Sequence, residues 1–339
     1  MTIVTEAPQE FAADRYDTMP YRRCGSSGLK LPLLSLGFWQ ALGVPGQEDE
    51  CKRCMYYAFD HGVTHFDLAN NYGPPPGNSE RVVGKILKEM PRDELIISSK
   101  AGYGMWSGPY GDGGSKKYLV ASLDQSLSRL GLEYVDIFYH HRVDPETPLE
   151  ETMGALDLIV KQGKALYVGV SNYPGERYLR ANDVIRRHDW SPLTIHQPYY
   201  NLLSRGVETD LLPHVDHGGT GVIAFCPLSG GVLTDRYIDG LPPDSRHGRS
   251  GEAGRQWWQA QKEKGVWDRL AKLNAIAKER GQTLAQMALA WVVRLPGVTS
   301  ALMGASNVEQ VKQNLGTLAN LNFSDEELAR IDAITANWP

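Results

Sequence analysis

The stretch YVDIFYHHRVDPETPLEETMGALDLIVKQGKALYVGVSN (134–172) decides the fold of this chain. It starts with an apolar run (134–141), continues through an amphipathic segment (148–163) and ends in a second apolar run (165–172). Short apolar runs rich in β-branched and aromatic residues are typical of strands, whereas the segment between them has the length and apolar spacing of a helix. A strand, a helix and a strand in this order predict two parallel strands joined by a crossover helix.

The same alternation runs through most of the chain. Eight strand-like runs lie at 34–38, 64–70, 94–101, 134–141, 165–172, 193–200, 220–228 and 299–306. Helix-like segments between them lie at 50–62, 78–90, 115–131, 148–163 and 307–318. Eight such units in series predict an α/β fold, and favour a closed (β/α)8 TIM barrel over an open doubly wound sheet.

The start of the chain departs from this alternation. Residues 1–20 are polar and without a pattern, which predicts a flexible tail ahead of a single barrel domain (21–339). Two short runs on either side of Ser27 and Gly28 predict an N-terminal β-hairpin.

The second departure is a segment rich in Gly, Pro, Ser and Arg (229–265), which predicts a long loop after the seventh strand. Helix-like stretches follow it at 266–281 and 283–294. A last helix is expected from Ser324, because Glu327 stands in the position of a reciprocal capping partner.

Composition narrows the class of protein. The chain has 339 residues, 42% of them hydrophobic and 22% charged, and a net charge of −5, which gives no electrostatic reason to expect nucleic acid or an anionic membrane as a partner. Its N-terminus lacks the basic start and apolar core of a secretory signal. Four cysteines in so long a chain do not make a disulfide framework, and Cys51 and Cys54 have a redox-like spacing but fall inside a helix, which favours packing. We expect a reduced, cytoplasmic protein.

Polar side chains stand at or just after the ends of three strand-like runs. Asp67 and Tyr72 belong to THFDLANNYG (64–73), Lys100 to LIISSKAG, and His141 to VDIFYHHR. In a parallel barrel the carboxyl ends of all strands lie on one face, where active sites form. The sequence therefore predicts a proton-donating site that protonates a carbonyl oxygen.

Each of the four groups has an expected role. Tyr72 is the candidate acid, Lys100 is expected to lower its pKa, and Asp67 is expected to hold Lys100 charged and in place. Strand alternation puts His65 and Asp67 on one face. His141 is expected to hydrogen-bond the same substrate oxygen. An alternative stays open, because Lys100 at a strand end could instead attack a carbonyl as the Schiff-base lysine of an aldolase.

The cofactor site is not of the dinucleotide-binding type that needs Gly-x-Gly-x-x-Gly, because no such motif follows a strand. The upper rim of a barrel could bind a dinucleotide instead. GASNVEQVKQN (304–314) favours this, because a glycine and a serine open a helix whose backbone N–H groups favour phosphate. No further cluster has the spacing of a metal site next to His140 and His141.

Five stretches carry a resemblance to a known family: FDLANNYGPPPGNSE (66–80), EYVDIFYHHRVDPETPLEET (133–152), GKALYVGVSNY (163–173), GLPPDSR (240–246) and MGASNVEQVKQN (303–314). From about residue 21 to its C-terminus the chain resembles the aldo-keto reductases. Within that superfamily it is similar to the voltage-gated potassium channel β subunits, and closer still to the bacterial L-glyceraldehyde-3-phosphate reductases. The resemblance implies a (β/α)8 barrel and NADPH-dependent carbonyl reduction, with a catalytic tetrad at Asp67, Tyr72, Lys100 and His141.

The resemblance also implies cofactor contacts, position by position. The residues implied for the nicotinamide end are Ser171, Asn172, Gln197 and Phe225, and Trp39 and Asp67 are implied as further cofactor contacts. Those implied for the pyrophosphate are Cys226, Pro227, Leu228, Ser229, Gly230 and Arg236. Those implied for the adenosine end are Gly304, Ser306, Gln310, Gln313 and Asn314. Arg246 is the candidate basic group for the 2′-phosphate of NADPH or NADP+, because none stands near Ser306 in the sequence.

A substrate pocket and a choice of function follow from the same resemblance. The pocket is expected to draw on Trp39, Tyr72, Trp106, Tyr110, His140 and His141, with 102–114 as a lid. The channel subunits have asparagine where this chain has His141, which favours full reductase activity on short polar aldehydes such as L-glyceraldehyde 3-phosphate or methylglyoxal. A redox-sensing subunit that binds nucleotide but turns over negligibly stays open, as does a homo-oligomer.

Overall fold

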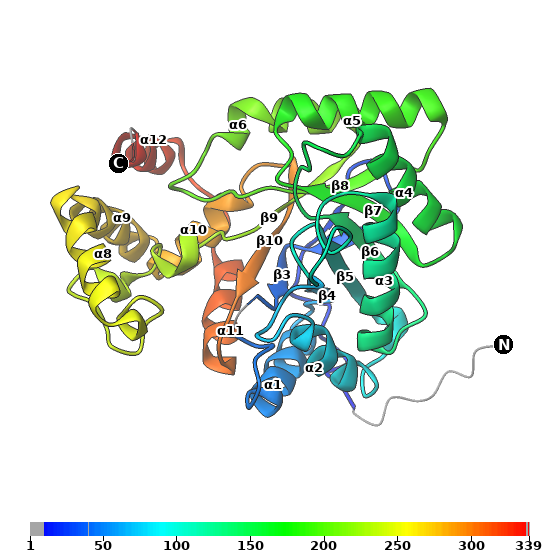
Figure 1. The fold of residues 1–339 in the computed structure, drawn as a ribbon. Helices are drawn as coiled ribbons and strands as arrows, with labels where there is room; N and C mark the ends of the chain where they lie inside the picture. Colours follow the sequence, from blue (N-terminus) through cyan, green and yellow to red (C-terminus); the bar gives the residue numbers. More distant parts are fainter. Residues whose placement is uncertain (1–9, 40, 337, 339) are drawn as a thin grey trace.

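The computed structural model describes residues 10–39, 41–336 and 338, and at its centre lies a closed barrel of eight parallel strands (Figure 1). The order around the barrel is β10-β3-β4-β5-β6-β7-β8-β9, with β10 paired to both β3 and β9. The predicted (β/α)8 barrel is therefore confirmed. The barrel strands are β3 (Leu34–Gly37), β4 (His65–Asp67), β5 (Ile96–Ala101), β6 (Val135–His140), β7 (Ala165–Ser171), β8 (Leu193–Gln197), β9 (Gly221–Ala224) and β10 (Val298–Gly304).

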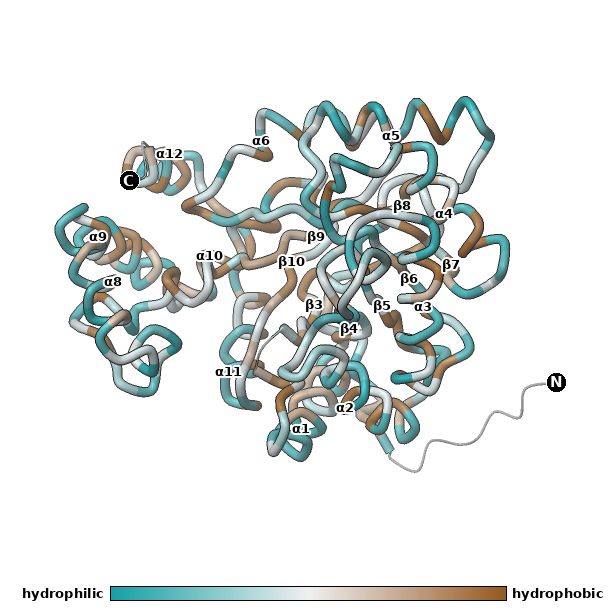
Figure 2. Tube along the Cα trace, viewed as in Figure 1, coloured by the Kyte–Doolittle hydropathy of each residue, from teal (hydrophilic) through white to brown (hydrophobic). Residues whose placement is uncertain are grey.

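Helices surround the barrel on the outside (Figure 1). They are α1 (Glu48–Phe59), α2 (Asn78–Leu87), α3 (Lys116–Leu130), α4 (Leu149–Lys161), α5 (Gly175–His188), α6 (Val207–Asp210), α7 (Leu212–Gly218), α8 (Glu252–Glu263), α9 (Val266–Glu279), α10 (Leu284–Val292), α11 (Val308–Leu315) and α12 (Asp325–Thr335). Figure 2 shows hydrophobic residues along the strands and hydrophilic residues on the outer turns of the helices, which is the pattern that buries one helix face against a sheet. In the described part of the chain, no helix has the length and apolar character of a membrane span.

Local sequence signals set several of the boundaries. The Ser324 side chain accepts a hydrogen bond from the Glu327 backbone N–H, and the Glu327 carboxylate accepts one from the Ser324 backbone N–H, so the predicted capping box at the start of α12 is confirmed. The Ser115 side chain caps α3 by accepting from the Tyr118 backbone N–H, and Gly131 ends that helix in the left-handed conformation that glycine adopts without strain. The predicted hairpin is β1 (Tyr21–Arg23) paired antiparallel with β2 (Lys30–Pro32).

The end of the expected N-terminal tail differs from the sequence analysis. Phe11 packs edge-on against the rings of Tyr56 and Phe59 on α1, with ring centroids 5.2 and 4.8 Å apart. Met19 is buried in the same cluster. Residues 10–20 thus lie against the outside of the barrel, because two apolar side chains that the polar composition concealed find a site on α1. Residues 1–9 lie outside the described part of the chain.

The long excursion after β9 is present, but part of it is helical. It contains three short 3-10 turns, η2 (Ser229–Gly231), η3 (Asp235–Tyr237) and η4 (Gly248–Ser250), and then α8. The sequence analysis assigned all of 229–265 to a loop. The helix forms because Trp257 and Trp258 pack against Trp267 of α9, with ring centroids 5.6 and 5.8 Å apart.

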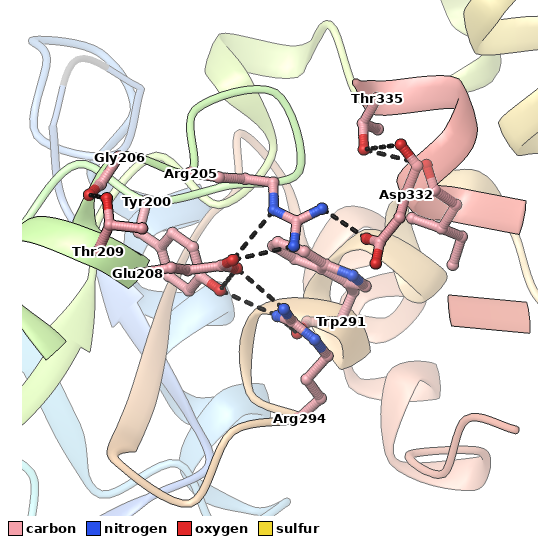
Figure 3. A network of polar contacts seen from close by, with 10 residues as sticks. Tyr200, Arg205, Gly206, Glu208, Thr209, Trp291, Arg294, Asp332 and Thr335 are labelled. Atoms are coloured by element: carbon pink, nitrogen blue, oxygen red, sulfur yellow. Dashed lines mark hydrogen bonds and ion pairs between the residues drawn. The ribbon is translucent and has the colours of Figure 1, made fainter. Parts of the chain in front are cut away.

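A polar network ties the segment after β8 to α10 and α12 (Figure 3). The Glu208 carboxylate accepts hydrogen bonds from Arg205, Arg294 and Tyr200, at 2.9, 2.9 and 2.6 Å. Trp291 lies between the two guanidinium groups, which are 4.9 and 3.6 Å from its ring. The network fixes the chain that leads out of β8, at the carboxyl end of the barrel where active sites form.

Candidate active site

The ends of β4 and β5 bring an acid and a base into contact inside the barrel. Lys100 Nζ lies 2.5 Å from Asp67 Oδ2 and 2.7 Å from the Leu68 carbonyl oxygen. The other oxygen, Asp67 Oδ1, accepts hydrogen bonds from Ser98 Oγ at 2.6 Å and from Gln197 Nε2 at 3.2 Å. Asp67 and Lys100 have no exposed surface, so this is a fully buried ion pair with its hydrogen bonds satisfied.

Tyr72 and His141 lie next to this pair. Lys100 Nζ lies 5.1 Å from the centroid of the Tyr72 ring, and the Tyr72 and His141 rings are 6.0 Å apart. Tyr72 is partly exposed, whereas Lys100 behind it is not. The structure thus brings all four groups of the expected tetrad together, with the phenol as the member that a substrate can reach.

The protonation states follow from burial. Burial, with Asp67 second, raises the pKa of Tyr72 well above its usual value. Burial, helped by the charge of Lys100, lowers the pKa of His141 well below its usual value. At neutral pH Tyr72 therefore carries a proton to donate, and His141 is neutral. The sequence analysis expected Lys100 to lower the pKa of Tyr72; the direction is opposite, because Asp67 neutralises the lysine at close range and desolvation dominates.

The position of Lys100 disfavours Schiff-base chemistry. A nucleophilic lysine needs a neutral amine with an open path to the substrate carbonyl. Burial does lower the pKa of Lys100, but Asp67 opposes this and the amine donates to both Asp67 and Leu68 with no exposed surface. A substrate carbonyl meets Tyr72 first.

His140 does not line the substrate pocket that the sequence analysis assigned to it. Its side chain has no exposed surface, and Nδ1 lies 2.7 Å from the Tyr173 hydroxyl. Successive side chains of a strand point to opposite faces, so His140 points out of the barrel where His141 points in. Burial lowers the pKa of His140 to about 4, so it is a neutral group packed beneath α4 and α5.

Of the aromatic residues expected in the substrate pocket, some are exposed and others are packed against neighbouring side chains. Trp39 and Tyr110 are about half exposed, at 48% and 54%, and are free to contact a ligand. Trp106 instead packs on Tyr118, with ring centroids 5.1 Å apart. Tyr103, which the sequence analysis did not single out, lies edge-on to His141 at 4.8 Å.

Three residues expected at the nicotinamide end are neighbours at the ends of β7 and β8. Ser171 Oγ donates to the Gln197 carbonyl oxygen at 2.7 Å, and Asn172 Nδ2 donates to Ser171 Oγ at 3.1 Å. Asn172 also donates to the His141 carbonyl oxygen at 3.3 Å. Paired amide and hydroxyl groups of this kind suit a carboxamide, which needs both donors and acceptors.

Backbone strain marks the same rim. Among the described residues, four that are not glycine have positive φ, and three of them, Asn172, Cys226 and Ser229, belong to the expected cofactor set. Such conformations cost about 1–3 kcal/mol each and gather at binding and catalytic sites. Phe225 lies beside Tyr199 with ring centroids 5.4 Å apart, and Pro227 is buried while Leu228 and Gly230 are partly exposed.

The two arginines of the excursion are placed differently from one another. Arg236 is exposed and pairs with Asp244 at 2.7 Å. Arg246 lies 5.1 Å from the Trp39 ring, and its Nη1 would be 3.4 Å from a Cβ built on Gly230. The sequence analysis made Arg246 the candidate for a 2′-phosphate. That role stays a prediction; the side chain lies beside Trp39 and Gly230, and Gly230 is expected at the pyrophosphate, so the charge of Arg246 also suits the diphosphate.

The residues expected at the adenosine end surround the start of α11. Asn307 caps this helix, and Gln310 Oε1 accepts from both the backbone and the hydroxyl of Ser306, at 2.9 and 3.1 Å. Asn314 Nδ2 donates to the Gly304 carbonyl oxygen at 3.2 Å. Gln313 is exposed and contacts Glu309. Neutral donors at a helix N-terminus suit a phosphate.

A comparison with known proteins agrees with the barrel. The sequence model of the aldo/keto reductase family matches residues 33–336. The chain belongs to this family. It is 53% identical over 324 residues to the L-glyceraldehyde 3-phosphate reductase of Escherichia coli, covering 94% of this chain and 93% of that protein. It is 36% identical over 322 residues, 93% of each chain, to a putative voltage-gated potassium channel subunit beta of Schizosaccharomyces pombe.

Membership of the aldo/keto reductases makes this protein an oxidoreductase, and the family generally uses NADP(H). The rim fits such a cofactor in kind: amide and hydroxyl groups for a carboxamide, Arg246 beside Gly230 for a diphosphate, and the start of α11 for a further phosphate. When bound, the nicotinamide supplies a hydride to a carbonyl carbon.

The structure bears on two features of the sequence, the closely spaced cysteines Cys51 and Cys54 and a possible metal site next to His140 and His141. Cys51 and Cys54 are buried inside α1, and burial raises the pKa of Cys54 to about 12, so neither has the character of a reactive thiol. Within the described residues no group of three or more His, Cys, Asp or Glu side chains could hold a metal ion. The cysteines are packing residues of the core.

Sequence reasoning missed side chains that support the site. Ser98 contacts Asp67 directly, and His65 contacts Asp67 through Ser98. At the expected lid, Arg142 donates to the Gly102 carbonyl oxygen and to Asp112. A polar residue two positions before a strand-end charge, on the same face, was an available signal for Ser98. Arg142 carried no signal, since a charged residue after a strand is most often solvated.

Proposed function

We propose that this aldo/keto reductase reduces short polar aldehydes to alcohols with NADPH, and that L-glyceraldehyde 3-phosphate and methylglyoxal-like compounds are among its substrates. The observation that carries the proposal is a partly exposed, protonated Tyr72 beside a buried Lys100–Asp67 ion pair and a neutral His141. The likeness to the L-glyceraldehyde 3-phosphate reductase of Escherichia coli supports the choice of aldehyde.

The residues of this chain act on the carbonyl oxygen. Tyr72 donates its proton to the oxygen as negative charge develops there, and a developing alkoxide is basic enough to take a proton from a phenol of raised pKa. The Lys100 ammonium, held by Asp67, stabilises the phenolate that remains. His141, neutral and facing the same space, orients the carbonyl by a hydrogen bond.

The rim residues orient the cofactor in this proposal. Ser171, Asn172 and Gln197 would hold the carboxamide, Phe225 would stack on the nicotinamide, and Arg246 would pair with the diphosphate. The N-terminus of α11 with Ser306 holds the phosphate at the adenosine end. Residues 21–339 act as one catalytic unit, in the reducing cytoplasm, where four free cysteines are stable.

A steady-state screen tests this function. The purified protein is mixed with NADPH or NADH and with L-glyceraldehyde 3-phosphate, methylglyoxal, and an apolar aldehyde as the contrast, and the loss of nicotinamide absorbance is followed. The proposal expects turnover of the polar aldehydes at rates typical of enzymes, about 1 s⁻¹ or more. Tight nucleotide binding with turnover thousands of times slower would favour the redox-sensing subunit instead.

A further inference from the structure

A buried chain of hydroxyl and imidazole groups leads to Asp67 from deeper in the barrel. Ser98 Oγ lies 2.6 Å from Asp67 Oδ1, and His65 Nε2 lies 2.9 Å from Ser98 Oγ. His65 Nδ1 lies 2.9 Å from Ser35 Oγ, which lies 2.8 Å from Ser300 Oγ. None of the five side chains has any exposed surface. We call Ser300, Ser35, His65 and Ser98 the Asp67 relay.

The Asp67 relay crosses four neighbouring strands. Ser300 is on β10, Ser35 on β3, His65 on β4 and Ser98 on β5. Asp67 and Ser98 are direct partners in the register of β4 and β5, and strand alternation turns both into the barrel. The barrel itself therefore sets the spacing of the relay, and no flexible loop takes part.

Chemistry fixes the direction of every hydrogen bond in the Asp67 relay. The Asp67 carboxylate, paired with Lys100, can only accept, so the single hydrogen of Ser98 points to it. Ser98 must then accept from His65 Nε2–H. Burial lowers the pKa of His65 to about 4, so the ring is neutral and its Nδ1 has no hydrogen. Nδ1 accepts from Ser35.

The remaining link follows from the same rule. Ser35 has used its one hydrogen on His65, so it can only accept from Ser300 at 2.8 Å. The Leu33 carbonyl oxygen lies farther from the Ser300 hydroxyl, at 3.4 Å, and is the weaker acceptor for its hydrogen. All four donors therefore point toward Asp67. Each group in the chain donates to the next one, so the whole chain ends on Asp67 Oδ1.

We propose that the Asp67 relay orients the Asp67 carboxylate toward Lys100, and that His65, locked with its hydrogen on Nε2, is the positioning residue of this relay. The proposal rests on the proposed function, because it gives Asp67 its catalytic value through Lys100 and Tyr72. Without the relay, Asp67 Oδ1 keeps only the 3.2 Å bond from Gln197, and the orientation of the carboxylate then depends on the bond from Lys100 to Oδ2.

The chain offers a matched pair of variants. Ser98 and Ser99 are adjacent on β5, both without exposed surface, and each donates a 2.6 Å hydrogen bond to a buried carboxylate. Ser98 donates to Asp67 inside the barrel, whereas Ser99 donates to Glu80 outside it. Ser98→Ala and Ser99→Ala therefore remove the same kind of bond and differ in whether the Asp67 relay is broken.

Kinetics with L-glyceraldehyde 3-phosphate form the first arm. We expect Ser98→Ala to lower kcat about tenfold or more with KM within about threefold, since a hydrogen bond to a charged group contributes on that scale. The two variants should lower the midpoint of urea denaturation by similar amounts, since each loses one buried hydrogen bond. Ser99→Ala should leave kcat within about twofold of wild type. Should Ser98→Ala not fold, Ser35→Ala takes its place, with a smaller fall in kcat expected, about threefold.

Nuclear magnetic resonance of the nucleotide-free protein is the second arm and needs no activity. With 15N-labelled histidine at pH 7.5, His65 should show a protonated Nε2 and an unprotonated Nδ1; its signals are assigned by their loss in His65→Gln. Ser98→Ala should move both signals toward their average. A wild-type His65 protonated on Nδ1, or equal kcat losses in Ser98→Ala and Ser99→Ala, would overturn the proposal. A wild type that reduces no aldehyde contradicts the proposed function alone, and the tautomer still decides the relay.

Discussion

Lys100 Nζ lies 2.5 Å from Asp67 Oδ2, and neither side chain has any exposed surface. A buried ion pair of this kind is rarely kept for stability alone, because the desolvation of two charges offsets most of their attraction. Here it places a positive charge 5.1 Å from the centre of the Tyr72 ring. In the proposed mechanism, the pair stabilises the phenolate that remains after proton donation.

Breaking this pair should separate stability from activity. Lys100→Met leaves the Asp67 carboxylate buried and unpaired, which should lower the free energy of unfolding by about 3–5 kcal/mol. In the double variant Lys100→Met with Asp67→Asn no buried charge is left, so most of that stability should return. In both variants, kcat should stay at least about 10²-fold below that of the wild type. Urea denaturation and steady-state assays measure the two effects; a double variant as unstable as the single one would contradict this.

Buried histidines should make stability depend on pH. Burial lowers the pKa of His65, His140 and His196 to about 4 each. Below about 6.5 the unfolded chain binds protons on these residues while the folded chain does not, so stability is fully present above 6.5 and is lost as the pH falls toward 4. Each should contribute about 1.4 kcal/mol per pH unit in that window.

Urea denaturation between pH 7.5 and 5 checks this dependence. His140→Gln should reduce the slope of the free energy of unfolding against pH by about 1.4 kcal/mol per pH unit, which corresponds to one proton. A stability that is flat from pH 7.5 to 5 would show that the histidines are not buried neutral groups.

The cofactor preference should depend on the start of α11 and not on Arg246. NADPH should bind about tenfold to a hundredfold more tightly than NADH, because Ser306 and the helix N-terminus favour the extra phosphate. Ser306→Ala should reduce that ratio. Arg246→Ala should weaken both cofactors alike, since its contacts are with Trp39 and Gly230. Titration by protein fluorescence measures both; equal wild-type affinities would remove the NADPH assignment.

The network around Glu208 should be worth several hydrogen bonds. Glu208→Ala leaves Arg205, Arg294 and Tyr200 without their shared acceptor, and should lower the free energy of unfolding by about 2–3 kcal/mol. Asp183→Ala, which removes an exposed pair with Arg186, should change it by less than about 0.5 kcal/mol. Urea denaturation compares the two, and equal losses would mean that the network is no stronger than a surface pair.

Periodicity was sufficient to predict the barrel, because each strand and its helix carry local patterns that agree with the global fold. The relation of Asp67, Lys100 and His141 could be predicted for the same reason, since strand ends meet on one face. His140 could not be placed correctly, because neighbouring side chains of a strand point to opposite faces. An error of one residue in the expected end of the strand therefore puts a side chain on the wrong face. The pKa of Tyr72 depends on desolvation, which no sequence pattern reports.

Helix α8 and residues 10–20 show a second limit. Both contain stretches whose polar or glycine-rich composition is typical of loops, and both are held by a few aromatic or apolar side chains, Trp257 and Trp258 in one and Phe11 in the other. Tertiary packing overrides weak local preference in such segments. In both segments, the structure depends on contacts with side chains of another helix, which the local sequence does not contain.

The most direct test of the account is the rate of L-glyceraldehyde 3-phosphate reduction by Tyr72→Phe beside the wild type, with NADPH affinity measured on the same samples. The variant keeps the ring and loses only the hydroxyl group that donates the proton, so kcat should fall about 10²–10⁴-fold while NADPH binds within a few-fold of wild type. A variant that retains activity within a few-fold of wild type would show that another group donates the proton, and the central claim would be wrong.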